Sequence, residues 1–138
     1  KALIDTTTDD YARVLDTNLK GVYLGSREAF KVMRARAGGT ILNMASVAGK
    51  DAWAGLGLYS ASKFAVVGLS RALADEGAPL GIRVSALCPG AVNTGVLTGV
   101  DPQQLIQPED VADAAMYLVT LPRNVEVREM VLDRREPR

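Results

Sequence analysis

The sequence alternates between helix-like and strand-like segments along its whole length. A nearly continuous apolar run, typical of a strand covered on both faces, lies at residues 40–45, and two further strand-like segments lie at residues 82–87 and 125–132. Segments with the length and spacing of helices lie at residues 9–36, 58–76 and 108–121. Because strands that are separated by helices pair in parallel, this order predicts an α/β fold with a parallel sheet between layers of helices.

Local signals indicate where the helices begin and end. Thr7, with Asp10 three residues later, predicts a capped start, and Gly38 predicts the end of the first helix. Pro108 suits the first position of the last helix. Gly21 lies in the middle of the first helix, where glycine costs about 1 kcal/mol relative to alanine. We therefore expect close packing to require it.

Composition excludes several classes of function. Sixteen basic residues balance sixteen acidic ones, and no basic stripe or polybasic run predicts binding to nucleic acid or to a membrane surface. The apolar runs are too short to cross a bilayer and no secretory signal opens the chain, which favours a cytoplasmic location. Cys88 is the only cysteine and histidine is absent, so an internal disulfide and histidine-based triads are excluded. No metal site is predicted.

A serine, a tyrosine and a lysine occur at a spacing that suits proton transfer at a carbonyl group. Ser46 follows the strand expected at 40–45, whereas Tyr59 and Lys63 are four residues apart and share a helix face. A cation one helical turn away stabilises a phenolate, which makes tyrosine a usable base. Ligands of open parallel sheets bind beyond the carboxyl ends of the strands, where Ser46 and Pro89 are both expected.

Each of these features has a simpler explanation when it is taken alone. A tyrosine four residues before a lysine is most often a half-buried ring beside a surface cation. A serine after a strand is most often a cap, an asparagine within a helix is most often solvated, and Pro-Gly is most often a turn. Their joint occurrence in one order is far more specific than any single motif and favours a functional site.

Four motifs in this order make the chain resemble the short-chain dehydrogenase/reductase family. They are Asn18-Leu19-Lys20-Gly21, Asn43-Met44-Ala45-Ser46, Tyr59-Ser60-Ala61-Ser62-Lys63 and Pro89-Gly90-Ala91-Val92-Asn93-Thr94. The similarity extends over nearly the whole chain. It implies that residues 1–138 form the C-terminal catalytic half of one Rossmann-like, doubly wound parallel domain, with its last three strands and their helices.

The resemblance also implies an activity and a role for each motif residue. The activity would be NAD- or NADP-dependent hydride transfer to or from a small alcohol or carbonyl substrate. Tyr59 would be the general acid/base, Lys63 would support it and hold the nicotinamide ribose, Ser46 would polarise the carbonyl, and Asn18 would hold a relay water to Lys63. The expected cofactor-binding residues are Tyr59, Lys63, Pro89, Gly90, Val92 and Thr94.

The helices at residues 9–36 and 58–76 would build a homo-oligomer, either a dimer or a tetramer. The second of these helices is rich in small residues and carries apolar groups such as Phe64 on more than one face. One face would cover the sheet, so the other needs cover as well.

The chain departs from the family pattern in its first half. A glycine-rich Gly-x-x-x-Gly-x-Gly turn and an Asn-Asn-Ala-Gly segment are absent, and the chain starts close to a helix cap. We therefore expect the N-terminal dinucleotide-binding half to be missing from the chain. The choice between NAD and NADP depends on that half and stays open, as do the substrate and the subgroup. The short loop from Gly95 to Gln107 predicts an open or small pocket.

Two alternatives remain. A truncated fragment without a dinucleotide site would be catalytically incompetent and would act as an interaction module. An epimerase or dehydratase of the extended branch would share the Tyr-x-x-x-Lys motif, although the Asn18 segment and the short C-terminal part argue against it. Titration with NADH and NADPH separates the first alternative from an enzyme.

Overall fold

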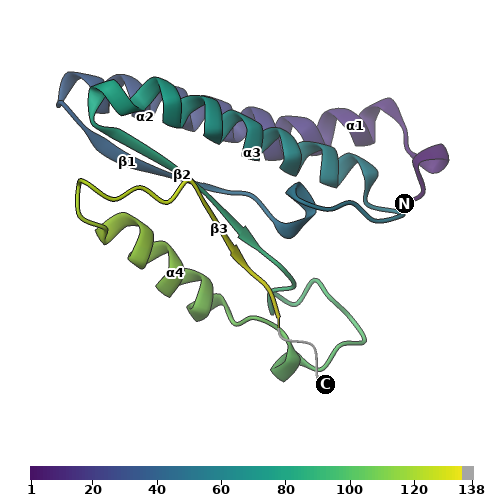
Figure 1. Ribbon diagram of the computed structural model, residues 1–138. Helices are drawn as coiled ribbons and strands as arrows, with labels where there is room; N and C mark the ends of the chain where they lie inside the picture. The colour runs from purple at the N-terminus through teal and green to yellow at the C-terminus, as the bar shows by residue number, and fades with distance from the viewer. Residues whose placement is uncertain (135–138) are drawn as a thin grey trace.

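Three parallel strands lie between two layers of helices in a computed structural model that describes residues 1–134 (Figure 1). The sheet order is β1-β2-β3, and the strands are β1 (Gly39–Met44), β2 (Ile82–Pro89) and β3 (Glu129–Leu132). One face is covered by α1, α2 and α3 and the other by α4. These helices are α1 (Thr8–Leu15), α2 (Gly21–Ala35), α3 (Gly57–Gly77) and α4 (Pro108–Thr120). The predicted α/β architecture with a parallel sheet is confirmed.

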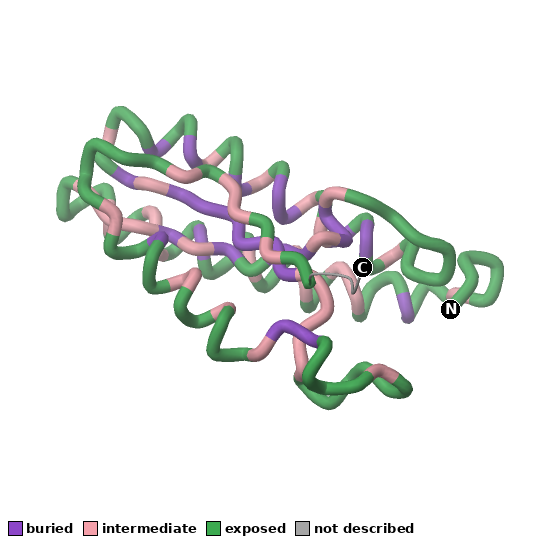
Figure 2. Tube along the Cα trace, turned by 60° about the horizontal axis from the view of Figure 1, so that its bottom comes forward, coloured by how far each residue is buried: buried purple, intermediate pink, exposed green. Residues whose placement is uncertain are grey.

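The core follows the central strand β2, whose residues are buried at all but one position (Figure 2). Two apolar clusters pack α3 onto the sheet; their members are Ala45, Val66, Val67, Ala86 and Cys88 in one, and Ile41, Ala74, Ile82 and Val84 in the other. A buried polar chain runs through the same layer. The Asn43 amide accepts from Ser26 Oγ at 3.1 Å and donates to Ser70 Oγ at 3.0 Å, which ties α2, β1 and α3 together.

The capping signals work as predicted. Thr7 Oγ1 accepts from the backbone N–H of Asp10 at 3.1 Å, and the Asp10 carboxylate accepts from the backbone N–H of Thr7 at the same distance. Lys1 also donates to Asp10, and these bonds lower the pKa of that carboxyl to about 2. Pro108 stands at the start of α4, and α2 ends just before Gly38.

The first helix differs from the single α-helix predicted over 9–36. Residues Asp16–Lys20 form a π-helical turn between α1 and α2, with Asn18 at its centre. The expectation that close packing requires Gly21 is wrong. A Cβ built on Gly21 would approach no neighbouring atom closer than 3.9 Å, because the π-helical turn before it leaves open space on that side.

The third strand begins four residues later than the predicted range of 125–132. In the residues just before β3, two backbone carbonyls accept hydrogen bonds from side chains of β2 rather than from a neighbouring strand's backbone. Arg83 Nη1 donates to the carbonyl of Val125 at 3.0 Å, and Ser85 Oγ donates to the carbonyl of Val127 at 2.6 Å. These bonds hold the segment against the sheet without regular pairing.

Each of the two outer strands pairs with β2 alone in the described chain. In the part of the chain that the structure describes, β1 pairs only with β2, so its other edge presents unpaired backbone groups. Met44, at the end of β1, is exposed. No helix among residues 1–134 has the length and hydropathy that a membrane crossing requires.

Candidate active site

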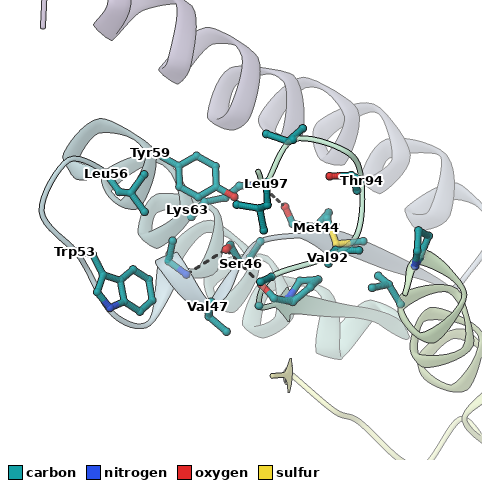
Figure 3. Close-up of a pocket in the computed structure, with 18 residues that line it drawn as sticks. Met44, Ser46, Val47, Trp53, Leu56, Tyr59, Lys63, Val92, Thr94 and Leu97 are labelled. Carbon is teal, nitrogen blue, oxygen red and sulfur yellow. Dashed lines mark hydrogen bonds between the residues drawn. The ribbon is translucent and has the colours of Figure 1, made fainter. Parts of the chain in front are cut away.

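A pocket of about 740 Å³ opens at the carboxyl edge of the sheet (Figure 3). The register pairs Met44 with Leu87 and Pro89 with Leu132, so the strand ends meet at this edge. Seven of the eight predicted site residues line the pocket: Ser46, Tyr59, Lys63, Pro89, Gly90, Val92 and Thr94. Asn18 does not line it. Residues from three separate segments therefore converge, as parallel-sheet geometry predicts.

Ser46 is held at the end of β1 by the turn that follows it. Its Oγ accepts from the backbone N–H of Ala48 at 3.1 Å and donates to the carbonyl of Pro89 at 3.4 Å. The bond to Pro89 is long for an O–H donor and therefore weak. The Ser46 hydroxyl thus loses little free energy if it turns to another acceptor. Ser46 thus carries both the capping role of a serine after a strand and a hydroxyl that faces the pocket.

Tyr59 and Lys63 project from the first turns of α3. The Lys63 Nζ lies 5.7 Å from the centroid of the Tyr59 ring and donates to the carbonyl of Met44 at 3.1 Å. Burial lowers the pKa of the Lys63 ammonium from its ordinary value. In the described chain the Tyr59 hydroxyl makes no hydrogen bond to protein, and about a third of the residue is exposed toward the pocket.

The turn after Ser46 packs directly on the backbone of α3. A Cβ built on Gly49 would lie 2.7 Å from the carbonyl oxygen of Lys63, a distance that real Cβ atoms do not reach. Only glycine therefore lets the 3₁₀ turn Val47–Gly49 contact the helix at this point. This contact fixes the distance between the elements that carry Ser46 and Lys63.

An ion-pair cluster fastens the other end of the same turn. Lys50 Nζ lies 2.6 Å from Glu129 Oε2, and Arg71 of α3 pairs with the other carboxylate oxygen. The Arg71 guanidinium and the Lys50 ammonium hold the pKa of the Glu129 carboxyl below its ordinary value. The turn is thus tied to β3 as well as to α3.

Asn18 lies outside the pocket, in the π-helical turn that packs beside α3. Its Nδ2 donates to the hydroxyl of Ser62 at 3.1 Å, and Ser62 Oγ donates to the carbonyl of Tyr59. Ser62 is fully buried, so this contact joins the π-helical turn to the helix that carries Tyr59 and Lys63. No hydrogen bond joins Asn18 to Lys63 in the described residues.

The segment from Pro89 to Thr94 forms the opposite rim. Gly90 donates its backbone N–H to the carbonyl of Leu132 at 2.7 Å, and a Cβ built on it would lie 2.5 Å from Asp133 Oδ1. A larger residue here would have to displace the Asp133 carboxylate. The Asn93 amide donates to Gln107 Oε1 at 3.1 Å, which holds the segment next to the start of α4.

Several lining residues were not predicted from the sequence. They are apolar and come mainly from two loops: Val47, Trp53, Leu56, Val96 and Leu97. Their signal was present, since large apolar residues in glycine-rich loops indicate a binding surface. The sequence predicted that the pocket is either open or small. A small pocket is wrong, because a volume of about 740 Å³ lies well within the range of ligand sites.

Comparison with known proteins gives two kinds of match. The family model described as short chain dehydrogenase matches residues 1–105. An uncharacterized oxidoreductase of Staphylococcus aureus is 30% identical over 132 residues, which cover 94% of this chain and 57% of that protein. The chain therefore spans little more than half the length of this relative.

Solved structures give the same relationship. Serine dehydrogenase from Escherichia coli superposes with a TM-score of 0.84 at 30% identity, and the match covers 96% of this chain and 56% of that one. The closed form of serine dehydrogenase complexed with NADP+ superposes with a TM-score of 0.85 at 26% identity, covering 96% and 58% respectively. With the matched family model, these likenesses establish that the chain belongs to the short-chain dehydrogenase family and forms part of its Rossmann-type fold.

Proposed function

We propose that this chain is the C-terminal, acid–base half of an NAD- or NADP-dependent oxidoreductase that interconverts a carbonyl compound and an alcohol. One observation carries the proposal: Ser46, Tyr59 and Lys63 share a single pocket with the Pro89–Thr94 segment. Membership of the short-chain dehydrogenase family and the NADP+ complex of a related structure support a nicotinamide cofactor.

The residues of the pocket fit the nicotinamide end of such a cofactor. The Pro89–Thr94 rim offers backbone and the apolar side chain of Val92, and Lys63 is the only charged residue in the lining. An ammonium has three N–H donors, and only one of them is used by Met44. The others are free for ribose hydroxyls. The Gly-x-x-x-Gly-x-Gly spacing of a pyrophosphate-binding turn does not occur in this chain.

The proposed roles of the protein residues in the reaction follow from the hydroxyl groups of Tyr59 and Ser46. The bound nicotinamide supplies the hydride that reduces the carbonyl carbon. Tyr59 donates its phenolic proton to the carbonyl oxygen as negative charge develops there, and Ser46 donates a hydrogen bond to the same oxygen. The Lys63 ammonium stabilises the phenolate that remains, because opposite charges at short range favour the ionised form. Oxidation of the alcohol runs through the same steps in reverse.

Asn18 acts behind this centre. Its Nδ2 is bound to Ser62, whereas its Oδ1 accepts no hydrogen bond from the described residues. That free acceptor holds the water through which Lys63 exchanges protons with solvent. The π-helical turn supports this role, since such turns occur frequently at functional sites.

A chimera tests the proposal. This chain replaces the 56% of Escherichia coli serine dehydrogenase that it covers, so that a complete dinucleotide site is present. We expect oxidation of NADPH or NADH that depends on added ketones or aldehydes and that the Tyr59→Phe change removes. A folded chimera that binds NADPH but reduces no carbonyl compound, or that is unaffected by Tyr59→Phe, would contradict the proposal.

A further inference from the structure

Among the residues that the structure describes, the pocket lining contains one charge and no carboxylate. Apart from the hydroxyl-bearing residues and Lys63, every side chain that lines it is apolar or absent. The Lys63 ammonium lies beside the Tyr59 ring, at the end of the pocket where the proposed reaction takes place. A substrate arm that extends away from these two residues would therefore meet no cation among the described lining residues.

Apolar side chains line the pocket on both sides of Ser46, and the large ones next to Tyr59 form a separate group. In Figure 3, Trp53, Leu56 and Val47 lie on one side of Ser46, and Val92 and Thr94 lie on the other. Leu97 closes the space between them. We call the set Val47, Trp53, Leu56 and Leu97 the apolar wall.

The apolar wall is built into the loop and is not a set of stray surface residues. The backbone N–H of Leu56 donates to the carbonyl of Trp53 at 3.1 Å, so a turn presents both side chains together just before α3. Trp53 is 49% exposed, Leu56 43% and Leu97 46%. Three large apolar groups that share one pocket and remain this exposed form a surface that gains free energy when a ligand covers it.

We propose that the apolar wall binds an uncharged hydrocarbon arm, so that the site takes ketones and aldehydes that carry no carboxylate or phosphate. That the bound ligand is a substrate rests on the proposed function, but the binding preference rests on the pocket lining alone. A carboxylate placed against the wall loses its water and finds no partner there, which opposes binding.

The tryptophan makes the preference directly measurable. Trp53 is the only tryptophan in the chain, so its emission reports on the apolar wall without any cofactor or turnover. We compare 2-octanone with 7-oxooctanoate, which has the same chain length and a terminal carboxylate, at constant ionic strength. We expect 2-octanone to shift the emission to shorter wavelength and to bind at least tenfold more tightly. Equal binding, tighter binding of 7-oxooctanoate, or no response to either compound would overturn the inference.

A charge placed in the wall provides the reciprocal test. Leu97→Lys gives the wall a cation, and we expect it to tighten 7-oxooctanoate binding about tenfold and to weaken 2-octanone binding. Met116→Lys is the matched control, because Met116 is similarly exposed but lies on α4 outside the pocket. Equal effects of the two variants would show that general charge, and not the wall, decides binding.

The same ligands separate this inference from the proposed function. If the chimera binds 2-octanone but transfers no hydride, the oxidoreductase proposal fails and the binding preference stands. If the chimera reduces 2-octanone and 7-oxooctanoate with equal kcat/KM, the oxidoreductase proposal stands, and the binding preference inferred for the apolar wall is wrong.

Discussion

The ammonium of Lys63 lies 5.7 Å from the centroid of the Tyr59 ring, one helical turn further along α3. It reaches this position because burial of its aliphatic stem and a hydrogen bond to the carbonyl of Met44 fix the side chain. The relationship places a cation beside a phenol at the mouth of a pocket, which is where the proposed proton transfer requires it.

Replacement of Tyr59 by phenylalanine should remove turnover and leave the fold intact. The hydroxyl makes no hydrogen bond to the described protein, so the free energy of unfolding should change by less than about 0.5 kcal/mol. Loss of the general acid should lower kcat of the chimera at least about 100-fold, while NADPH affinity is kept. Steady-state kinetics and urea unfolding measure the two effects. A kcat within tenfold of the unsubstituted chimera would show that another group supplies the proton.

Lys63→Met should damage both catalysis and cofactor affinity, and it should change the pH dependence of stability. Burial lowers the pKa of Lys63 in the folded state, so the folded protein is penalised while the ammonium is charged. The free energy of unfolding of the unsubstituted chain should therefore rise, relative to Lys63→Met, as pH increases toward the ordinary lysine value of 10.5.

Urea unfolding at several alkaline pH values measures this difference, and fluorescence titration measures NADPH affinity in the chimera. Parallel stability curves for the two proteins would mean that Lys63 titrates as it does in the unfolded chain. An affinity that stays unchanged would remove the ribose-binding role.

Gly49→Ala should destabilise the chain by about 1–3 kcal/mol, because the added methyl group would push the turn away from the Lys63 backbone. Gly68→Ala in α3 is the matched control. Nothing lies within 4 Å of a Cβ at Gly68, so alanine should stabilise that helix by about 0.5–1 kcal/mol. Chemical denaturation compares them, and similar effects of both changes would argue against the close contact.

The chain should form a two-fold dimer through the outer surface of α1, α2 and α3. That surface exposes several large apolar residues: Tyr11, Tyr23, Leu24, Val32 and Phe64. Phe64→Glu should shift the mass measured by light scattering at micromolar concentration toward the monomer, whereas Met116→Glu on α4 should not. A monomer before any substitution would contradict this prediction.

The isolated chain should not work as a dehydrogenase, although the chimera should. It lacks a glycine-rich pyrophosphate turn, and each 1.4 kcal/mol of lost anchoring weakens cofactor binding about tenfold. The free edge of β1 should also promote association. Assays of both proteins with NADH and NADPH, after confirmation of mass, check the expectation. Equal turnover by the two would show that the chain carries a complete cofactor site.

The element order was predictable because the strands are mainly apolar and because Thr7 and Pro108 mark the starts of the first and last helices. The position of Ser46, Tyr59 and Lys63 at one edge followed from parallel pairing. The π-helical turn was not predictable, since one extra residue in a turn leaves the composition unchanged. The late start of β3 depends on Arg83 and Ser85, whose side chains bind its backbone from a neighbouring strand.

The π-helical turn also determines which neighbouring element each part of the long first helix contacts. A π-helical turn holds one more residue than an α-helical turn, so the residues after it lie about 100° behind their positions in a continuous α-helix of the same sequence. In the observed arrangement α1 contacts α3, whereas α2 contacts β1 and packs Phe30 and Met33 against the core. A regular α-helix with all of these residues would turn Phe30 and Met33 away from the sheet, whereas deletion of a single residue between Asp16 and Lys20 would leave them facing it. The π-helical turn is therefore what keeps α1 and α2 in phase with different surfaces.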